Sequence, residues 1–377
     1  MKFLHLSDLH IGKRVNGFSM LEDQEYILEK ILEIVSSEKP NGVLIAGDIY
    51  DKTVPPAAAV SVFDEFLVKL SKLNCEVFII SGNHDSPERL AFANRLMEGA
   101  GVHISSVYNG EVLPYVLEAD GLKVNIYSMP FVKPANVKAH FPDIEINNYT
   151  DALRTAIEHM QINENEINIC IAHQFVTGAT RCDSEENVGG LDNVDASVFS
   201  VFDYTALGHI HGAQNLGDSK IRYCGSPLKY SFSEKNHRKA VTVIEISDKD
   251  NINVRTVDLI PKTDMMQIKG TYDEITRRDY YENKDFKNAY LHIVLTDEND
   301  IINVSSLLRI IYKNMMSIEY DNSRTRNYQA INLVGKVENK TPKQLFGELF
   351  ELRNNKEMTD EQKEYLQKVI EEVWGDI

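Results

Sequence analysis

The sequence has few cysteines, no long apolar run and no excess of positive charge. The cysteines have no close partner in the sequence, so neither a disulfide framework nor a thiolate zinc site is expected, and a reducing cytoplasm fits best. No stretch approaches the roughly eighteen apolar residues of a membrane span, and His5 and Asp8 come too early for a signal peptide. We therefore expect a cytoplasmic protein without a membrane segment. The four cysteines are Cys75, Cys170, Cys182 and Cys224.

Charge and length narrow the class further. The chain carries 57 acidic and 40 basic residues, a formal net charge of -17, which argues against a basic protein that holds nucleic acid by bulk electrostatics. Any phosphate substrate therefore needs a local attraction. At 377 residues the chain should form two or three domains, because single cores stop growing near about 250 to 300 residues.

Short apolar runs alternate with amphipathic segments, which predicts strands with covering helices. Helices are expected near 22–38, 57–73, 87–98 and 150–162, the third with Ser86 as N-cap and Pro87 at its first position. Because early strands alternate with helices and later ones follow each other closely, we expect a two-layered sheet with helices outside. The predicted strands are "KFLHLS", "NGVLIAG", "CEVFIIS", "KVNIYSM", "INICIA", "YTALG", "IRYCG", "AVTVIEIS" and "INVRTVDL".

Five of these strands end in side chains that can bind a metal or move a proton. In open α/β sheets ligands bind outside the carboxyl ends of the strands, so these ends should converge on one crevice. Asp8 and His10 follow the first strand, Asp48 and Asp51 the second, Asn83, His84 and Asp85 the third, His173 the fifth, and His209 and His211 the sixth.

This mixed oxygen and nitrogen set is too rich for one ion and suits two divalent transition metals about 3.5 to 4 Å apart. Manganese, iron or zinc would fit, and we expect two Mn²⁺ ions. The spacings Asp8-x-His10 and His209-x-His211 place alternate side chains on one side of an extended backbone. Metals that share Asp48 would neutralise a phosphate and activate a water. The remaining histidines, His5, His103, His140, His159, His237 and His292, end no strand beside acidic partners and are interpreted as structural or surface residues.

Each motif alone is weak evidence of a metal site. The evidence lies in their joint occurrence in a fixed order. "DLH", "GDIYD", "GNHD", "AHQ" and "GHIH" together resemble the calcineurin-like metallophosphoesterases. That resemblance implies an α/β fold of four layers, a sandwich of two mixed sheets flanked by helices. "FLHLSDLHIGK", "AGDIYDKTVPP", "SGNHDSPERL", "VGGLDNVD" and "GSPLKYSFSE" further resemble the bacterial SbcD nuclease family over essentially the whole chain.

The resemblance also implies roles for individual residues. His84 would be the catalytic histidine, close to the scissile phosphate but not on a metal, and Asp85 would orient it. Asp51 stands where eukaryotic and archaeal relatives have a histidine, so it is a candidate catalytic residue whose role stays open. One metal would be held by Asp8, His10, Asp48 and His211, and the other by Asp48, Asn83, His173 and His209.

The chain is expected to form three segments, whose roles the resemblance implies: a nuclease domain over 1–265, a small α+β capping domain over 266–340 that would guide DNA, and helices over 341–377 that would bind an ATPase. In the capping domain, "AYLHIVLTD" and "YQAINLVG" predict strands and "VSSLLRIIYKNMMS" predicts a helix. Its candidate phosphate contacts are Arg277, Arg278, Arg324 and Arg326. The last segment has two Thr-x-x-Gln capping boxes, Thr341 with Gln344 and Thr359 with Gln362.

The function implied by the resemblance is a metal-dependent DNA nuclease, a 3'-5' double-strand exonuclease and single-strand or hairpin endonuclease. It would act as a homodimer through the nuclease domain, with two copies of an SbcC-type ATPase, in DNA end processing and repair. The alternatives are a small-molecule phosphodiesterase or phosphatase with the same metal core, and an inactive scaffold, against which the intact ligand set argues.

Overall fold

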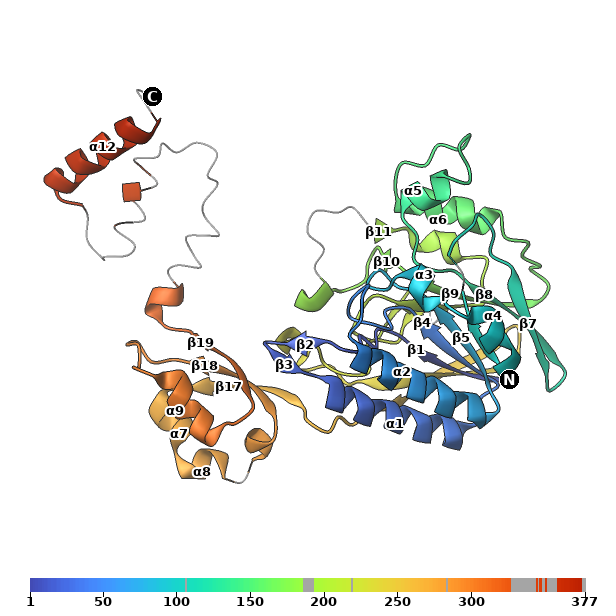
Figure 1. The fold of residues 1–377 in the computed structure, drawn as a ribbon, viewed down its shortest axis with the longest axis horizontal. Coiled ribbons are helices and arrows are strands. Elements are labelled where there is room, and N and C mark those ends of the chain that lie inside the picture. Colours follow the sequence, from blue (N-terminus) through green and yellow to red (C-terminus); the bar gives the residue numbers. More distant parts are fainter. Residues whose placement is uncertain are drawn as a thin grey trace. The chain divides into compact units, whose positions relative to one another are not determined.

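The computed structural model describes residues 1–105, 107–185, 193–217, 220–282, 284–326, 344, 346–347, 350 and 358–374. The chain divides into two compact units. Unit 1 comprises 1–267, 285–292 and 312–317, and unit 2 comprises 268–284, 293–311 and 318–377. Figure 1 shows the elements of each unit. The domain boundaries expected from the sequence stay a prediction.

Unit 1 is built on two six-stranded mixed sheets. In the first sheet β1, β4, β5 and β6 are parallel, and β15 is antiparallel to both β1 and β16. In the second, β8, β9, β12 and β14 are parallel and both edge strands are antiparallel. The first sheet has the order β16 (Asn251–Asp258), β15 (Ala240–Asp248), β1 (Lys2–Leu6), β4 (Gly42–Ala46), β5 (Glu76–Ile80) and β6 (Val102–Ile104). The second has the order β13 (Gln214–Leu216), β14 (Ile221–Tyr223), β12 (Tyr204–Gly208), β9 (Ile167–His173), β8 (Leu122–Ser128) and β7 (Pro114–Ala119).

The apolar runs of the central strands are continuous because both faces of each sheet are buried. Side chains alternate between the faces of a strand, so Leu44 packs in the core between the two sheets while Val43 and Ile45 pack under the helices. In the second sheet, Ile169 and Ile171 face the first sheet.

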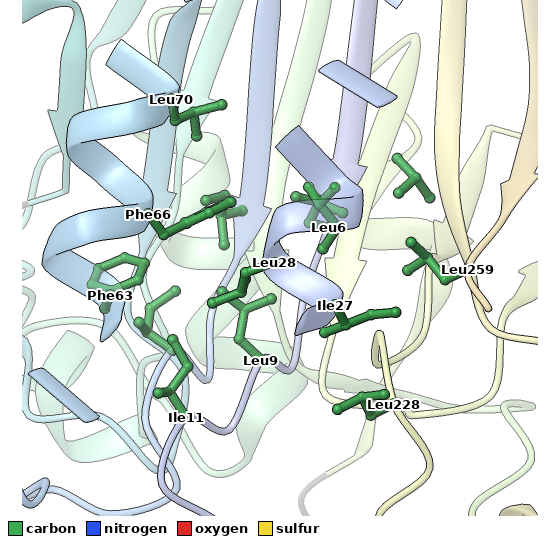
Figure 2. Packing of buried hydrophobic residues seen from close by; sticks show 14 of the residues in the cluster. Leu6, Leu9, Ile11, Ile27, Leu28, Phe63, Phe66, Leu70, Leu228 and Leu259 are labelled. Atoms are coloured by element: carbon green, nitrogen blue, oxygen red, sulfur yellow. The ribbon is translucent and has the colours of Figure 1, made fainter. Parts of the chain in front are cut away.

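Helices cover the outer face of each sheet. Helices α1 (Leu21–Glu38) and α2 (Ala57–Leu70) cover the first sheet, and Figure 2 shows side chains of both helices in this core, among them Leu28 of α1 and Phe66 of α2. Helices α5 (Pro134–Lys138) and α6 (Tyr149–Glu158) pack on the second sheet. The order helix, sheet, sheet, helix confirms the expected sandwich of four layers.

All nine predicted strands are present, but the helix predicted over 87–98 is not continuous. It forms α3 (Pro87–Leu90) and α4 (Asn94–Met97), separated at Ala93, whose φ of 61° lies in the left-handed region. Ser86 occupies the N-cap position, yet its hydroxyl donates a hydrogen bond of 2.9 Å to Glu88 and does not cap the helix. The remaining elements of unit 1 are β2 (Arg14–Val15), β3 (Phe18–Ser19), β10 (Phe175–Val176) and β11 (Asn193–Val194), with short 3-10 turns.

A three-stranded sheet follows the sandwich in the chain, in the order β17 (Met265–Gly270), β18 (Tyr290–Leu295) and β19 (Met315–Tyr320). The helix predicted over 304–317 is too long. Helix α9 (Val304–Ile311) ends earlier, because Met315 and Met316 are buried in β19. The strand predicted from "YQAINLVG" lies outside the described residues. The other helices here are α7 (Tyr272–Thr276) and α8 (Arg278–Tyr281).

Helix α12 (Asp360–Trp374) begins with the predicted capping box. The Thr359 main-chain N–H donates to Gln362 Oε1 at 2.9 Å, and the Gln362 N–H donates to Thr359 Oγ1 at 3.3 Å. Thr341 lies outside the described residues. Among the helices that the structure describes, none has the length and apolar composition that crossing a membrane requires.

Candidate metal centre

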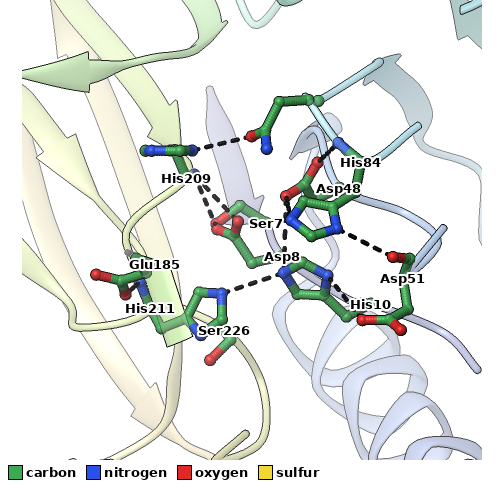
Figure 3. Close-up of polar contacts among 12 residues, drawn as sticks. Ser7, Asp8, His10, Asp48, Asp51, His84, Glu185, His209, His211 and Ser226 are labelled. Carbon is green, nitrogen blue, oxygen red and sulfur yellow. Dashed lines mark hydrogen bonds and ion pairs between the residues drawn. The ribbon is translucent and has the colours of Figure 1, made fainter. Parts of the chain in front are cut away.

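The structure brings all ten predicted site residues together at one edge of the two sheets. Figure 3 shows Asp8, His10, Asp48, Asp51, His84, His209 and His211. They follow the carboxyl ends of β1, β4 and β5 in the first sheet and of β9 and β12 in the second. Most of them are nearly inaccessible to solvent, whereas the His84 side chain is 38% exposed. The crevice expected from the strand ends therefore lies between the two sheets, and both sheets supply its walls.

Asp48 lies at the centre of this set. Its Oδ2 atom is 3.5 Å from His173 Nε2, 3.6 Å from His10 Nε2 and 4.0 Å from His84 Nε2. The side chain itself is only 3% exposed. One carboxylate therefore faces imidazoles from three different loops, as a ligand shared by two ions would.

Two further sets of contacts bring the other candidate ligands together. On one side His10 Nε2 and His211 Nε2 face each other at 3.1 Å. On the other side Asn83 Oδ1 is 3.0 Å from both His173 Nε2 and His209 Nδ1.

The chemistry of these donors fits divalent metal ions. Within the described chain, three groups of buried or partly buried ligand atoms lie within 4.8 Å of one another. His10 Nδ1 is buried and has no hydrogen-bond partner in the structure, a costly arrangement for a polar atom. The three groups are Asp8, His10 and His211; His10, Asp48 and His84; and Asp8, Asp48 and His173.

Tight turns after the strands aim these side chains inward. Asp8, His10, Asp48 and His209 all have positive φ, between 44° and 102°, a region that Asp and His adopt more readily than bulkier residues. Hydrogen bonds hold the turns, for example from the His10 N–H to the Asp48 carbonyl at 2.9 Å. Backbone strain of this kind persists where the surrounding structure imposes it, and it is common at functional sites.

The glycine of the "GNHD" motif is required by close approach. A Cβ atom on Gly82 would lie 2.1 Å from Asp48 Oδ1, and the same atom on Gly208, which precedes His209, would lie 1.9 Å from the Ala46 carbonyl oxygen. Any larger residue would displace Asp48 or separate the two sheets. The motif glycines thus allow the ligand loops of different strands to touch.

Mutual charges set the protonation of the centre. Burial raises the pKa of Asp8, and the nearby imidazoles oppose that shift. Burial also acts to raise the pKa of Asp48, but the positive charges of His173 and His10 outweigh it and hold that pKa well below its usual range. Burial lowers the pKa of His173, yet the charge of Asp48 raises it to about 9. Asp48 is therefore ionised at neutral pH, the state in which a carboxylate binds a cation.

His84 is oriented by a main-chain group. Its Nδ1 lies 3.0 Å from the carbonyl oxygen of Asp51. A carbonyl only accepts, so Nδ1 carries the proton and donates, and Nε2 is directed towards Asp48.

The expectation that Asp85 orients His84 stays a prediction, and the contacts of Asp85 are with main-chain groups. The Asp85 carboxylate accepts hydrogen bonds from the N–H groups of Ile49, Tyr50 and Gly82, at 2.9 to 3.1 Å. It joins the loops that follow β4 and β5. Burial and the charge of Asp48 raise the pKa of Asp85 to about 6.

Asp51 contacts the site through both its main chain and its side chain. Its carbonyl holds His84, and its carboxylate forms an ion pair of 2.7 Å with Lys13 and lies 3.8 Å from His10 Nδ1. Both side chains of the ion pair are about one-sixth exposed, at 15% and 16%. Lys13 was missed from the sequence because a lone lysine after "DLHIG" looks like a surface charge.

A second set of residues, which the sequence did not predict, forms hydrogen bonds with the candidate metal ligands. Glu234 Oε1 accepts from His211 Nδ1 at 3.1 Å, and the buried Lys239 ammonium donates to Glu234 Oε2 at 2.6 Å. Such carboxylate–histidine contacts fix the ring and raise its basicity as a ligand. Glu185 accepts from the His211 N–H, and Gln24 donates to the His10 carbonyl at 2.7 Å. Burial distinguishes these residues from surface charges, and burial is not visible in the sequence.

The four arginines expected to contact phosphate belong to the second unit. Each forms an ion pair with a nearby carboxylate and is 61% to 81% exposed. Water and salt screen exposed ion pairs of this kind, so the pairing does not prevent these arginines from binding a phosphate. The partners are Asp279 for Arg277, Glu282 for Arg278, Asp300 for Arg324 and Asp321 for Arg326.

A sandwich of two mixed sheets with buried carboxylates and imidazoles at one edge defines a metallophosphoesterase. Residues 1–213 match the family model described as calcineurin-like phosphoesterase, and residues 261–354 match the model described as type 5 capsule protein repressor C-terminal domain. A relative from Staphylococcus epidermidis, the SbcD subunit of the nuclease SbcCD, is 34% identical over 340 residues, which cover 88% of this chain and 89% of the relative. The chain belongs to the SbcD family of calcineurin-like phosphoesterases.

Two solved structures show likeness at 12% identity. One is a dimetal phosphatase from Danio rerio, with a TM-score of 0.42 over 69% of this chain and 96% of the other. The second is a protein of Thermus thermophilus, with a TM-score of 0.38 over 69% of this chain and 99% of the other.

Proposed function

We propose that this chain is the nuclease component of an SbcCD-type complex and hydrolyses phosphodiester bonds of DNA. The observation that carries the proposal is Asp48, a buried carboxylate within 4.0 Å of three imidazoles from three loops. The similarity to an SbcD nuclease along nine-tenths of that protein supports DNA as the substrate. The expected activities are 3'-5' exonuclease on double strands and endonuclease on single strands and hairpins.

We assign the two ions, taken to be Mn²⁺, to the sides of Asp48. When bound, the ions would supply Lewis-acid chemistry, with polarised phosphate oxygens and a lowered pKa of the attacking water. Asp48 would be common to both ions and keep them close together. The first would also have Asp8, His10 and His211, and the second Asn83, His173 and His209.

His84 then acts on the substrate and not on a metal. Because Nδ1 donates to the Asp51 carbonyl, Nε2 faces the substrate. With Nε2 also protonated, as in the imidazolium, its N–H can stabilise charge on the phosphate or pass its proton to the leaving oxygen. Asp85 supports this indirectly, since it holds the loop that carries His84 against the loop that carries Asp51.

The proposal extends to partners and location. We infer an SbcC-type ATPase partner, a complex with two copies of each protein, and a homodimer through the nuclease domain. We also infer a cytoplasmic location, because the complex would act on cellular DNA and use ATP. We keep the three segments 1–265, 266–340 and 341–377 as nuclease, capping and ATPase-binding parts.

A digestion panel tests the proposal. The purified chain, alone and with its ATPase, is incubated with Mn²⁺, Mg²⁺ or Zn²⁺ and offered circular single-stranded DNA, blunt duplex DNA and small phosphate esters. We expect Mn²⁺-dependent cleavage of DNA, with ATP-stimulated cleavage of blunt ends in the complex. Hydrolysis of small esters with no cleavage of any DNA would replace the nuclease by a small-molecule phosphodiesterase.

A further inference from the structure

The two ring nitrogens of His10 face different groups. Nε2 faces other candidate ligands, at 3.1 Å from His211 Nε2 and 3.6 Å from Asp48 Oδ2. Nδ1 is on the other side of the ring, where Asp51 Oδ1 lies 3.8 Å away (Figure 3). With Nε2 used as a metal ligand, the proton of the neutral ring is on Nδ1, which is buried without a hydrogen-bond partner among the described residues. This N–H needs an acceptor, and the Asp51 carboxylate faces it.

The Asp51 carboxylate is held in place by Lys13. The Lys13 ammonium donates to the same Oδ1 atom at 2.7 Å, and the two side chains are only 15% and 16% exposed. Lys13, like His10, follows β1, whereas Asp51 follows β4. The main chains of the two loops are joined as well, because the Asp51 N–H donates to the Ile11 carbonyl at 3.3 Å. The packing of two loops therefore sets the position of the carboxylate beside the ring.

The same arrangement occurs at His211. Glu234 Oε1 lies 3.1 Å from His211 Nδ1, and the Lys239 ammonium donates to Glu234 Oε2 at 2.6 Å. Both imidazoles assigned to the first ion thus have a lysine-paired carboxylate on the side of Nδ1. By contrast, His173, which is assigned to the second ion, donates from Nδ1 to the neutral Ala46 carbonyl at 2.8 Å. The repeated arrangement indicates a common task at one ion.

We propose that Asp51, held by Lys13, positions His10 as a ligand of the first ion. The inference rests on the proposed metal assignment and deepens it, because it gives a role to the side chain of Asp51. A carboxylate on the Nδ1 side fixes the orientation of the ring and the position of its proton, and it makes Nε2 a stronger electron donor to a metal. Asp51 is then a positioning residue, and its side chain does not act on the substrate.

Manganese titrations of the full chain, stripped of metal with a chelator, test this role. The electron paramagnetic resonance signal of free Mn²⁺ gives the number of bound ions and the affinity of each. Asp51→Asn removes the charge and keeps the main-chain carbonyl that holds His84. Asp203→Asn is the matched control, because Asp203 is 12% exposed and forms an ion pair of 2.8 Å with Lys249. Asp203 precedes β12, whereas His209 follows it.

For Asp51→Asn we expect one of the two ions to bind about tenfold more weakly or worse, the effect of losing the partner of a ligand. The other ion should keep its affinity, and the metal-free chain should be as stable as the Asp203→Asn control. Cleavage of single-stranded DNA by Asp51→Asn should recover when Mn²⁺ is raised above the weakened dissociation constant.

Lys13→Met separates positioning from net charge. Loss of a positive charge alone would tighten the binding of a cation. We expect the opposite, weaker binding of the same ion as in Asp51→Asn, because the carboxylate is no longer held beside His10.

Wild-type affinity for both ions in Asp51→Asn would overturn the positioning role. So would tighter manganese binding in Lys13→Met, and so would a loss of DNA cleavage in Asp51→Asn that excess Mn²⁺ does not restore, since Asp51 would then be a catalytic residue. A wild-type chain that binds two Mn²⁺ ions and cleaves no DNA would overturn the proposed function, and that result is distinct from the other three.

Discussion

At the scale of single residues, the proposed pair of metal ions depends on Asp48. Its carboxylate faces the ligands of either side, so Asp48→Ala should lose both ions and not one. Elemental analysis of the purified variant gives the metal content, and Asp64→Ala, an exposed position on α2, is the control. Two tightly bound metals in Asp48→Ala would disprove the shared ligand.

His84 separates metal binding from turnover. The His84→Gln variant should keep both ions and its affinity for DNA, because the other ligands are complete without it. Turnover should fall by about 10² or more, the range for a group that transfers a proton or stabilises charge. The measurements are metal content, DNA binding and kcat, with the exposed His140→Gln as control. A lost metal would place His84 among the ligands.

His5 makes the stability depend on pH. It is fully buried between the sheets, where Nε2 donates to the Leu207 carbonyl at 3.2 Å and Nδ1 accepts from the Tyr204 hydroxyl at 3.1 Å. Burial, helped by the charge of Arg222, lowers the pKa of His5 to about 3. Below pH 6.5 the unfolded chain takes up a proton that the folded chain does not, so stability falls as pH falls from 6.5 towards 3.

The lowered pKa of His5 also sets the size of the pH effect on stability. Wild type should be more stable than His5→Gln at pH 7, and the difference in free energy of unfolding should narrow by about 2 kcal/mol at pH 5. Denaturant titrations of both proteins at the two pH values, at equal metal loading, measure it. A difference that does not change with pH would contradict the prediction.

At the scale of elements, the sequence predicts those features of the fold that depend on the local pattern of apolar and polar residues. The nine strands and the residues at their ends follow from apolar runs and their polar exits. The break at Ala93 and the early end of α9 do not, because tertiary contacts decide them: Met315 is buried in a strand although its neighbours read as a helix. The same limit hides Glu234 and Lys239, whose roles come from being buried beside His211.

The segment around α3 and α4 bears on the predicted dimer. Phe92 and Leu96 are 81% and 82% exposed, unusual for large apolar side chains, and Val60 on α2 is 44% exposed. If these elements form the interface, Leu96→Asp should convert a dimer to a monomer, since a buried unpaired charge is costly. Light scattering at micromolar concentration measures the mass. Val116→Asp, at an exposed apolar site on the edge strand β7, is the control and should leave the dimer intact.

At the scale of the whole molecule, the distribution of charge limits which groups can provide affinity for DNA. The chain is acidic overall, and four arginines of the second unit, Arg277, Arg278, Arg324 and Arg326, are already paired with carboxylates. Affinity for DNA must then come from the metals, from a few local groups and from a partner. Isolated chain and complex should therefore differ more in KM for DNA than in hydrolysis of a small diester.

The C-terminal segment is where the partner would bind. Helix α12 carries apolar residues spaced as one stripe, of which Leu366 and Ile370 are buried while Tyr365 is 72% exposed. Burying several such side chains contributes roughly 1.5 to 3 kcal/mol each, which together exceeds the free energy that association costs.

A chain that ends at Lys340 should still bind two metals and nick single-stranded DNA, yet no longer co-purify with the ATPase or show ATP-stimulated cleavage. Co-purification measures this, and Tyr365→Asp in the full chain repeats the test without deleting any residue. If both variants bind the ATPase as well as wild type does, the apolar stripe packs within the chain instead. If the truncated chain is insoluble while the Tyr365→Asp chain binds normally, the segment belongs to the core.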